Sequence, residues 1–221
     1  EAVERIKAAI PKGVALIGFA GGPWTVATYM LQGRGGEKDE ARRVAYERAQ
    51  DVDSLLDVLV ETTAHHLAAQ VKAGADCLQI FESWAEGLSP ALFQRLVIAP
   101  TRHLVNRVRA LGVTAPIIGF PRGAGVQIQA YANETGITAL GVDTQTPADF
   151  AIEVTPERFP LQGNLDPQTL VVGGEILERA ARDVLIAFQA APHIFNLGHG
   201  ITPDATPENV ADLIRIVKGG A

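Results

Sequence analysis

The sequence predicts an α/β protein, an incomplete barrel of the (β/α)8 TIM type with about six of its strands present. Two observations predict it. Short apolar runs recur along the chain, and each ends in glycine, proline or polar residues, which is typical of buried parallel strands. Helical patterns lie between the runs, and strands that alternate with helices form parallel sheets with right-handed crossovers. The runs cover residues 14–19, 77–81, 116–120, 139–143, 159–164 and 193–198.

The helices are predicted by apolar residues that recur every three or four positions. The second pattern ends at Gly74 and the third at Gly112, where glycine is a common helix stop. The third begins at Ser89 before a proline, which is typical of an N-cap, and Pro100 predicts a bend within it. The last helix begins at Thr206. These patterns cover residues 3–10, 55–71, 90–111, 176–188 and 207–217.

The domain organisation follows from the even composition of the chain. No linker or low-complexity stretch divides it, so we expect a single barrel domain over residues 1–221. A closed barrel needs eight strands, and the chain opens at Glu1 inside a helical pattern. We therefore expect a domain that is truncated at its N-terminus. An open doubly wound sheet is the alternative, but no Gly-x-Gly-x-x-Gly motif follows the first run, which argues against its dinucleotide-binding version.

Composition excludes several classes of function. The net charge is −6 and no basic stripe appears, which argues against a nucleic-acid partner. No apolar stretch is long enough to span a bilayer, and no signal peptide opens the chain, so we expect no membrane partner. We expect a cytoplasmic protein, which a single cysteine also fits. The single cysteine, Cys77, excludes a disulfide within the chain and any metal site that needs several cysteines. It lies inside an apolar run, and we expect it in the core.

Candidate site residues follow the apolar runs, because the active site of an α/β barrel lies at the C-terminal ends of its strands. Several of them also have an ordinary structural interpretation. Asp166 before a proline is typical of an N-cap, and Asp143 is suited to hold a turn. Ser83 fits a turn as well as a site, and Arg122 fits either an exposed loop or a carboxylate-binding role. His199 has glycine on both sides, which favours a ligand-binding role. The candidates occupy residues 21–24, 82–84, 121–123, 143–144, 164–166 and 199–200.

Five of these segments carry a family resemblance. They are GFAGGPWT at residues 18–25, QIFESWA at 79–85, GFPRG at 119–123, QGNLDP at 162–167 and NLGHGI at 196–201. Together, and in this order, they resemble uroporphyrinogen decarboxylase over the whole chain. Five matching blocks in order are a far stronger signal than any one alone.

The resemblance implies a function. Uroporphyrinogen decarboxylases are cofactor-free carboxy-lyases of haem and porphyrin biosynthesis. They remove the four acetate carboxyl groups of uroporphyrinogen III in steps to give coproporphyrinogen III, and they are usually cytoplasmic homodimers. The resemblance implies the same tetrapyrrole substrate here, with no metal and no other cofactor.

Site residues are carried over by position. Tyr29, Ser83 and His199 match the substrate-contacting residues of the family, and Phe81 matches an apolar position beside the tetrapyrrole. We expect Tyr29 and His199 to be catalytic, and Arg122 to supply positive charge for the substrate carboxylates. The central expectation is that Tyr29, Ser83 and His199 converge at the rim of one apolar cup.

Two elements of the family are expected upstream of residue 1: an arginine-rich loop and the aspartate that holds the pyrrole NH groups. We therefore expect this chain to be inactive alone. Departures inside the chain are minor; Glu86, for example, stands in a loop where small residues are more usual.

Two alternatives stay open. A corrinoid-linked methyltransferase would share the fold, but its zinc site needs cysteine together with histidine, and the lone Cys77 argues against it. A non-catalytic barrel remnant is the second alternative.

Overall fold

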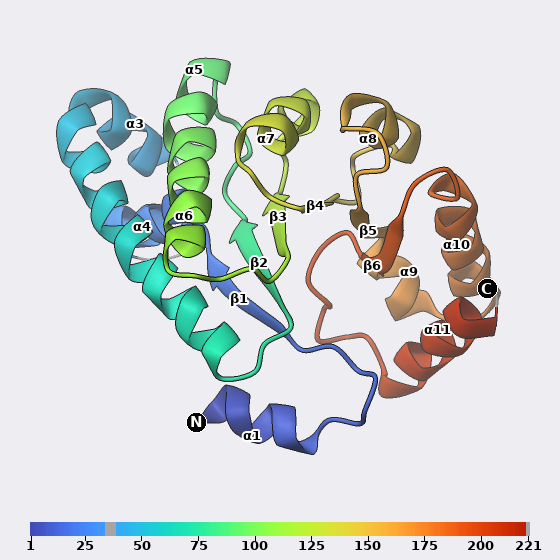
Figure 1. Cartoon of the computed structure of the whole chain (residues 1–221). Coiled ribbons are helices and arrows are strands. Elements are labelled where there is room, and N and C mark those ends of the chain that lie inside the picture. Colours follow the sequence, from blue (N-terminus) through green and yellow to red (C-terminus); the bar gives the residue numbers. More distant parts are fainter. Residues whose placement is uncertain (34–38, 220–221) are drawn as a thin grey trace. The chain divides into compact units, whose positions relative to one another are not determined.

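The computed structural model describes residues 1–33 and 39–219, and the chain divides into two compact units, Glu1–Thr138 and Ala139–Ala221 (Figure 1). Each unit is built from parallel strands with helices between them. The expectation of a single domain over residues 1–221 stays a prediction.

The first unit contains three parallel strands, β1 (Ile17–Gly21), β2 (Cys77–Glu82) and β3 (Ile117–Pro121). β2 pairs with both neighbours, and its Phe81 lies opposite Gly21 on one side and Phe120 on the other. Helices α4 and α6 lie side by side in Figure 1 and pack against each other. The helical elements of this unit are α1 (Ala2–Ala9), α2 (Pro23–Gln32), α3 (Asp39–Glu47), α4 (Ala49–Lys72), α5 (Pro90–Phe93), the π-helix η1 (Gln94–Ile98), α6 (Ala99–Ala110), the 3-10 helix η2 (Gly125–Gln127) and α7 (Ile128–Glu134).

The second unit repeats the pattern with β4 (Ala139–Gly141), β5 (Leu161–Leu165) and β6 (His193–Leu197), again parallel. Its helices are α8 (Ala148–Val154), α9 (Pro167–Val172), α10 (Gly174–Ala187) and α11 (Pro207–Gly219). Side chains from β5 and from α9, α10 and α11 form its core. The buried members are Leu165, Leu170, Leu177, Ala181 and Leu213.

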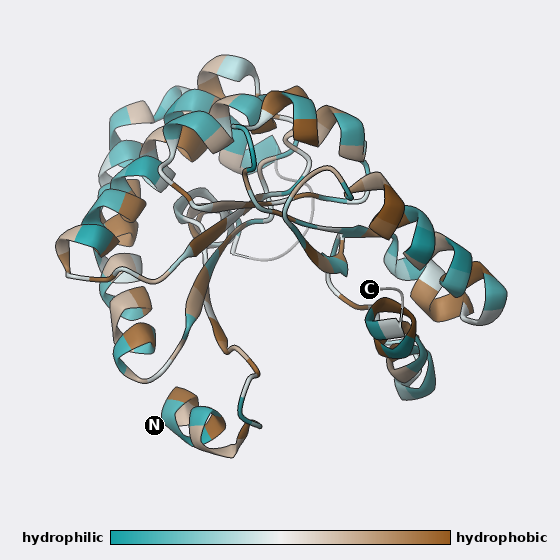
Figure 2. Cartoon of the chain, turned by 45° about the vertical axis from the view of Figure 1, so that its right-hand side comes forward, coloured by the Kyte–Doolittle hydropathy of each residue, from teal (hydrophilic) through white to brown (hydrophobic). Residues whose placement is uncertain are grey.

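All six apolar runs contain a strand, so the predicted fold class, an α/β protein with an incomplete TIM-type barrel of six strands, is confirmed for the part of the chain that the structure describes. Figure 2 shows why the elements associate: the strands are largely apolar, and the helices carry apolar residues on one side and polar residues on the other. Within residues 1–33 and 39–219, no helix combines the length and the apolar character that a membrane span requires.

Helix boundaries follow the predicted capping residues. Ser89 accepts a hydrogen bond from the Leu92 amide, and Asp166 accepts one from the Gln168 amide, so both predicted N-caps are confirmed. Gly74 and Gly112 follow α4 and α6 with φ of 110° and 84°, a left-handed conformation that glycine adopts without strain.

Replacing Asp166 with alanine should lower the free energy of unfolding by about 1 kcal/mol. The Gln168 amide at the start of α9 has no acceptor within the helix, and the substitution removes the side-chain oxygen that accepts from it. Asp166→Asn keeps an acceptor oxygen and should cost a few tenths of that. Urea unfolding of the two variants measures the difference. Equal stability of the alanine and asparagine variants would show that the cap contributes nothing.

Candidate active site

A row of aromatic rings crosses the strands of the first unit. The rings of Phe19 and Phe81 lie 5.9 Å apart, and those of Phe81 and Phe120 also lie 5.9 Å apart, both edge to face. One ring comes from each strand. Because side chains alternate along a strand, this row lies on the face opposite Gly18 and Gly119, where the helices pack. The side chain of Phe19 is 61% exposed, Phe81 is partly exposed and Phe120 is buried, so the row is accessible at its Phe19 end.

Glu82, the residue after Phe81, points to the opposite face and lies under the first turn of α2. Its carboxylate accepts hydrogen bonds from the amides of Trp24 (3.1 Å) and Thr25 (2.9 Å) and from the Thr25 hydroxyl (2.8 Å). It is fully buried. Glu82 therefore caps α2 from a neighbouring strand, since Gly22 at the N-cap has no side chain to do so.

Burial raises the pKa of Glu82 from 4.5 to about 7, although the hydrogen bonds from Thr25 and Trp24 oppose the shift. The phenol of Tyr131 on α7 is also buried, and its pKa is raised by burial and by the negative charge of Glu82. A carboxyl whose pKa is raised on folding stabilises the folded state below its unfolded pKa. The contribution of Glu82 is therefore full below pH 4.5 and is lost as the pH rises through about 7.

The turn after Glu82 is fastened to α2. The indole Nε1 of Trp24 donates to the carbonyl oxygen of Trp84 at 3.1 Å, and the Trp84 amide donates to the Thr25 hydroxyl at 3.4 Å. The ring of Tyr29, on the next turns of α2, lies 5.7 Å from the Trp84 ring. One assembly therefore lies at the C-terminal end of β2, and it consists of Trp24, Thr25, Tyr29, Ser83 and Trp84. The Tyr29 side chain is half exposed.

Arg122, directly after β3, joins the same assembly. Its amide donates to the carbonyl oxygen of Glu82 at 3.1 Å, and its guanidinium donates to the carbonyl oxygen of Ser83 at 3.3 Å. The guanidinium also forms an ion pair with Glu86 at 3.6 Å. Arg122 therefore brings positive charge to the strand ends, and Glu86 offsets part of it.

In the second unit, His199 is exposed in the loop after β6. Packing explains the glycine at position 198, because a Cβ there would lie 2.4 Å from the backbone nitrogen of Thr144. Asp143 holds the turn after β4 as predicted, since it accepts hydrogen bonds from the Gln145 amide and the Thr146 hydroxyl.

The structure places Tyr29, Phe81, Ser83 and Arg122 near the strand ends of the first unit, and their role in a site stays a prediction. Asp166 and Asp143 have the structural roles that their neighbours in sequence indicate. His199 belongs to the second unit, and its convergence with Tyr29 and Ser83 stays a prediction. Glu82 is one of the predicted strand-end residues, but its sequence neighbours indicate no role for it.

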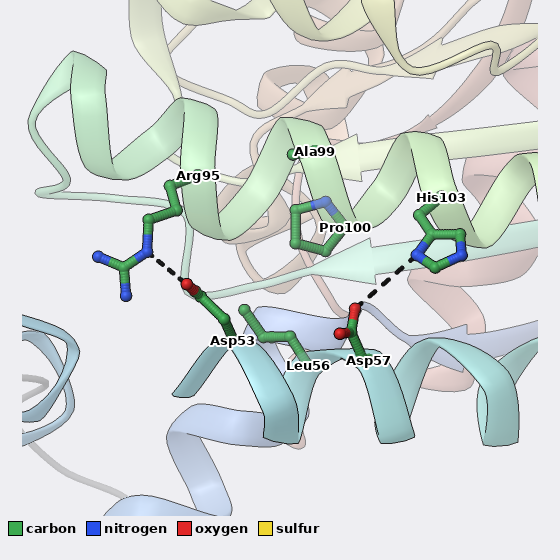
Figure 3. Close-up of a pocket in the computed structure, with 7 residues that line it drawn as sticks. All are labelled: Asp53, Leu56, Asp57, Arg95, Ala99, Pro100 and His103. Carbon is green, nitrogen blue, oxygen red and sulfur yellow. Dashed lines mark hydrogen bonds and ion pairs between the residues drawn. The ribbon is translucent and has the colours of Figure 1, made fainter. Parts of the chain in front are cut away.

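A cavity lies between α4 and the helical stretch formed by η1 and α6, with a volume of about 260 Å³ (Figure 3). Its charged groups are paired across the two elements. Arg95 lies 2.9 Å from Asp53, and His103 lies 3.9 Å from Asp57. These pairs join helices, away from the strand ends, so the cavity is not a candidate active site. Among residues 1–33 and 39–219, no three His, Cys, Asp or Glu side chains are grouped so that they could hold a metal ion.

Comparison with solved structures supports the fold. The chain is similar to a methyltransferase from Methanosarcina mazei, with a TM-score of 0.81 over 99% of this chain and 63% of that protein. The two sequences are 21% identical, so this likeness concerns the fold alone.

Comparison of sequences gives the family. A family model described as uroporphyrinogen decarboxylase (URO-D) matches residues 1–220. A uroporphyrinogen decarboxylase of Hyphomonas neptunium is 50% identical over 219 residues, which cover 97% of this chain and 64% of that protein. One of Sphingopyxis alaskensis is 46% identical over 220 residues, which cover 99% and 64%. The chain therefore spans slightly less than two thirds of these relatives, and it belongs to the uroporphyrinogen decarboxylase family.

Proposed function

We propose that the protein containing this chain is a uroporphyrinogen decarboxylase, which converts uroporphyrinogen III to coproporphyrinogen III by stepwise loss of four acetate carboxyl groups. The observation that carries the proposal is the family match over residues 1–220. The strand ends of the first unit support it, because they combine an apolar aromatic row with polar side chains around Ser83 and Arg122.

Binding of the tetrapyrrole calls for an apolar surface with polar groups at its edge. The row of Phe19, Phe81 and Phe120 offers the apolar surface to the tetrapyrrole, and its low dielectric strengthens nearby charged contacts. Ser83 and His199 donate hydrogen bonds to substrate carboxylates. The substrate carries many carboxylates while the chain is net acidic, so positive charge must be local, and Arg122 supplies part of it.

Decarboxylation of an acetate leaves an electron pair that needs an acceptor. A pyrrole protonated at the adjacent ring carbon is such an acceptor, so the site must stabilise a transient cation and supply protons. Tyr29 orients either the reacting acetate or the aspartate that holds the pyrrole NH groups. We assign His199 mainly to carboxylate binding. The aspartate that holds the pyrrole NH groups, and the further arginines, are expected outside this chain, so the chain alone is proposed to be inactive.

We further propose that the protein acts in the cytoplasm as a homodimer, without a metal or other cofactor. These proposals rest on the family resemblance. Sedimentation of the purified full-length protein tests the dimer.

The test of the function uses the complete reading frame that contains this sequence, expressed from its own start codon. Purified protein is incubated anaerobically with uroporphyrinogen III, and the products are oxidised and separated by number of carboxyl groups. The proposal predicts seven-, six-, five- and four-carboxyl porphyrins that appear in sequence. Unchanged eight-carboxyl substrate, with folded protein, would overturn it. The 221-residue chain assayed in parallel should give no product.

A further inference from the structure

Glu82 is a buried ionisable side chain that the proposed chemistry does not use. It is shielded from solvent, its carboxylate is hydrogen-bonded to Trp24 and Thr25 of α2, and its carbonyl oxygen accepts from the Arg122 amide after β3. Gly22 leaves room for it, because a Cβ at position 22 would lie 2.2 Å from the Glu82 Cδ atom. The carboxylate of Glu82 therefore fits in this position only because residue 22 has no side chain.

The hydrogen bonds around Glu82 run in one direction. The Trp84 amide donates to the Thr25 hydroxyl, and this hydroxyl donates its own proton to the Glu82 carboxylate. An ionised carboxylate accepts only, so it fixes the Thr25 hydroxyl as a donor to Glu82 and an acceptor from Trp84. A protonated carboxyl can itself donate a hydrogen bond, so it no longer fixes the Thr25 hydroxyl as the donor.

We propose that Glu82 is a positioning residue of this site: its carboxylate holds α2 and the Ser83–Trp84 turn together, and so sets where Tyr29 and Ser83 meet the substrate. The part of this inference that concerns substrate rests on the proposed function. The geometry around Glu82 does not depend on it. Glu82 acts through Thr25 and Trp84 and touches no reacting atom.

The structure offers a direct reporter, because the two tryptophans of the chain, Trp24 and Trp84, both belong to this assembly. The pKa of Glu82 near 7 makes the assembly titrate near neutrality. The titratable neighbour on α7 is Tyr131, whose pKa is raised, so it stays neutral in this range. Arg122, after β3, meets Glu82 through its backbone amide, while its guanidinium is directed to Ser83 and Glu86.

The first experiment is a pH titration of tryptophan emission in the 221-residue chain. The inference predicts a reversible change with a midpoint near pH 7, which Glu82→Gln abolishes. Glu153→Gln, which removes an exposed carboxylate on α8, is the matched control and should leave the titration unchanged. A titration in Glu82→Gln identical to that of the parent chain would overturn the inference.

A second pair of variants keeps the inference testable if Glu82→Gln does not fold. The Thr25 hydroxyl lowers the pKa of Glu82, so Thr25→Val should move the emission midpoint to higher pH. Thr25→Ser keeps the hydroxyl and should leave the midpoint in place. Equal midpoints in the valine and serine variants would contradict the inference.

The third measurement separates this inference from the proposed function. In the full reading frame, Glu82→Gln should raise KM for uroporphyrinogen about tenfold, with far-UV circular dichroism unchanged, because displaced Ser83 and Tyr29 bind substrate less well. An unchanged KM would refute the positioning role. If the parent protein shows no decarboxylation at all, the proposed function fails, and the emission titrations still decide whether Glu82 orders the assembly.

Discussion

Replacing Gly22 with alanine is expected to lower the free energy of unfolding by about 3 kcal/mol. The backbone at Gly22 has φ −67° and ψ 157°, which any residue adopts, so the cost does not arise from backbone strain. It arises because the new Cβ would lie 2.2–2.5 Å from three atoms of the Glu82 side chain. The carboxylate must move and give up its hydrogen bonds to Trp24 and Thr25. Urea unfolding followed by circular dichroism measures the loss.

A double-mutant cycle identifies the clash as the cause. In a Glu82→Ala background, the space beside position 22 is free, and adding Gly22→Ala should cost less than about 1 kcal/mol. Gly200→Ala is the matched single control, because its Cβ would have no neighbour within 4 Å. The account of the cap is wrong if Gly22→Ala is as stable as the parent chain, or if it costs equally in both backgrounds.

Replacing His199 with alanine in the full-length protein should reduce kcat/KM for uroporphyrinogen by about 10- to 100-fold. A hydrogen bond to a charged group contributes about 1.5–3 kcal/mol, and each 1.4 kcal/mol corresponds to a factor of ten. The side chain is exposed in the loop after β6, so its removal should leave the thermal midpoint unchanged. Steady-state kinetics and a thermal melt measure the two effects.

His66 offers the control for this variant, because it is an exposed histidine on α4, away from the strand ends. His66→Ala should leave both kinetics and stability unchanged. If His199→Ala retains full kcat/KM, His199 is removed from the site. If it melts well below the parent protein, the residue has a structural role instead.

The strands and the long helices were predictable because their signals are local. Residues 55–71 give an unbroken apolar face that Gly74 ends, and α4 ends at Lys72. The boundary of β5 differs by one or two residues from the predicted run because Pro160 has no amide proton for the strand ladder, and the strand begins at Leu161.

The short helices gave no comparable signal. The buried residues of α3 are Ala41 and Ala45, and that of α8 is Ala151. Alanine produces only a weak apolar stripe. Cys77 is only partly buried, although its run is apolar, because it alternates with Leu78 and shares the face of Phe81 instead of the face that the helices cover.

Candidate site residues were predictable as strand ends, but their contacts were not. Asp166 and Asp143 act on amides or hydroxyls two or three residues away, so their roles can be inferred from neighbouring sequence. Glu82 acts on amides 57 and 58 residues away, and nothing near it in sequence shows that α2 begins above it. An acidic residue that ends an apolar strand, together with a glycine at a distant helix start, is the signal that was available.

The central proposal, which rests on the family resemblance, is that Tyr29, Ser83 and His199 of the full-length protein bind one tetrapyrrole beside Phe81. The most direct measurement is a crystal structure of the full-length protein with coproporphyrinogen or an oxidised analogue bound. The account predicts that the macrocycle lies against Phe81 and that all three polar side chains reach it within hydrogen-bonding distance. A macrocycle bound elsewhere, or His199 pointing away from it while Tyr29 and Ser83 touch it, would contradict the account.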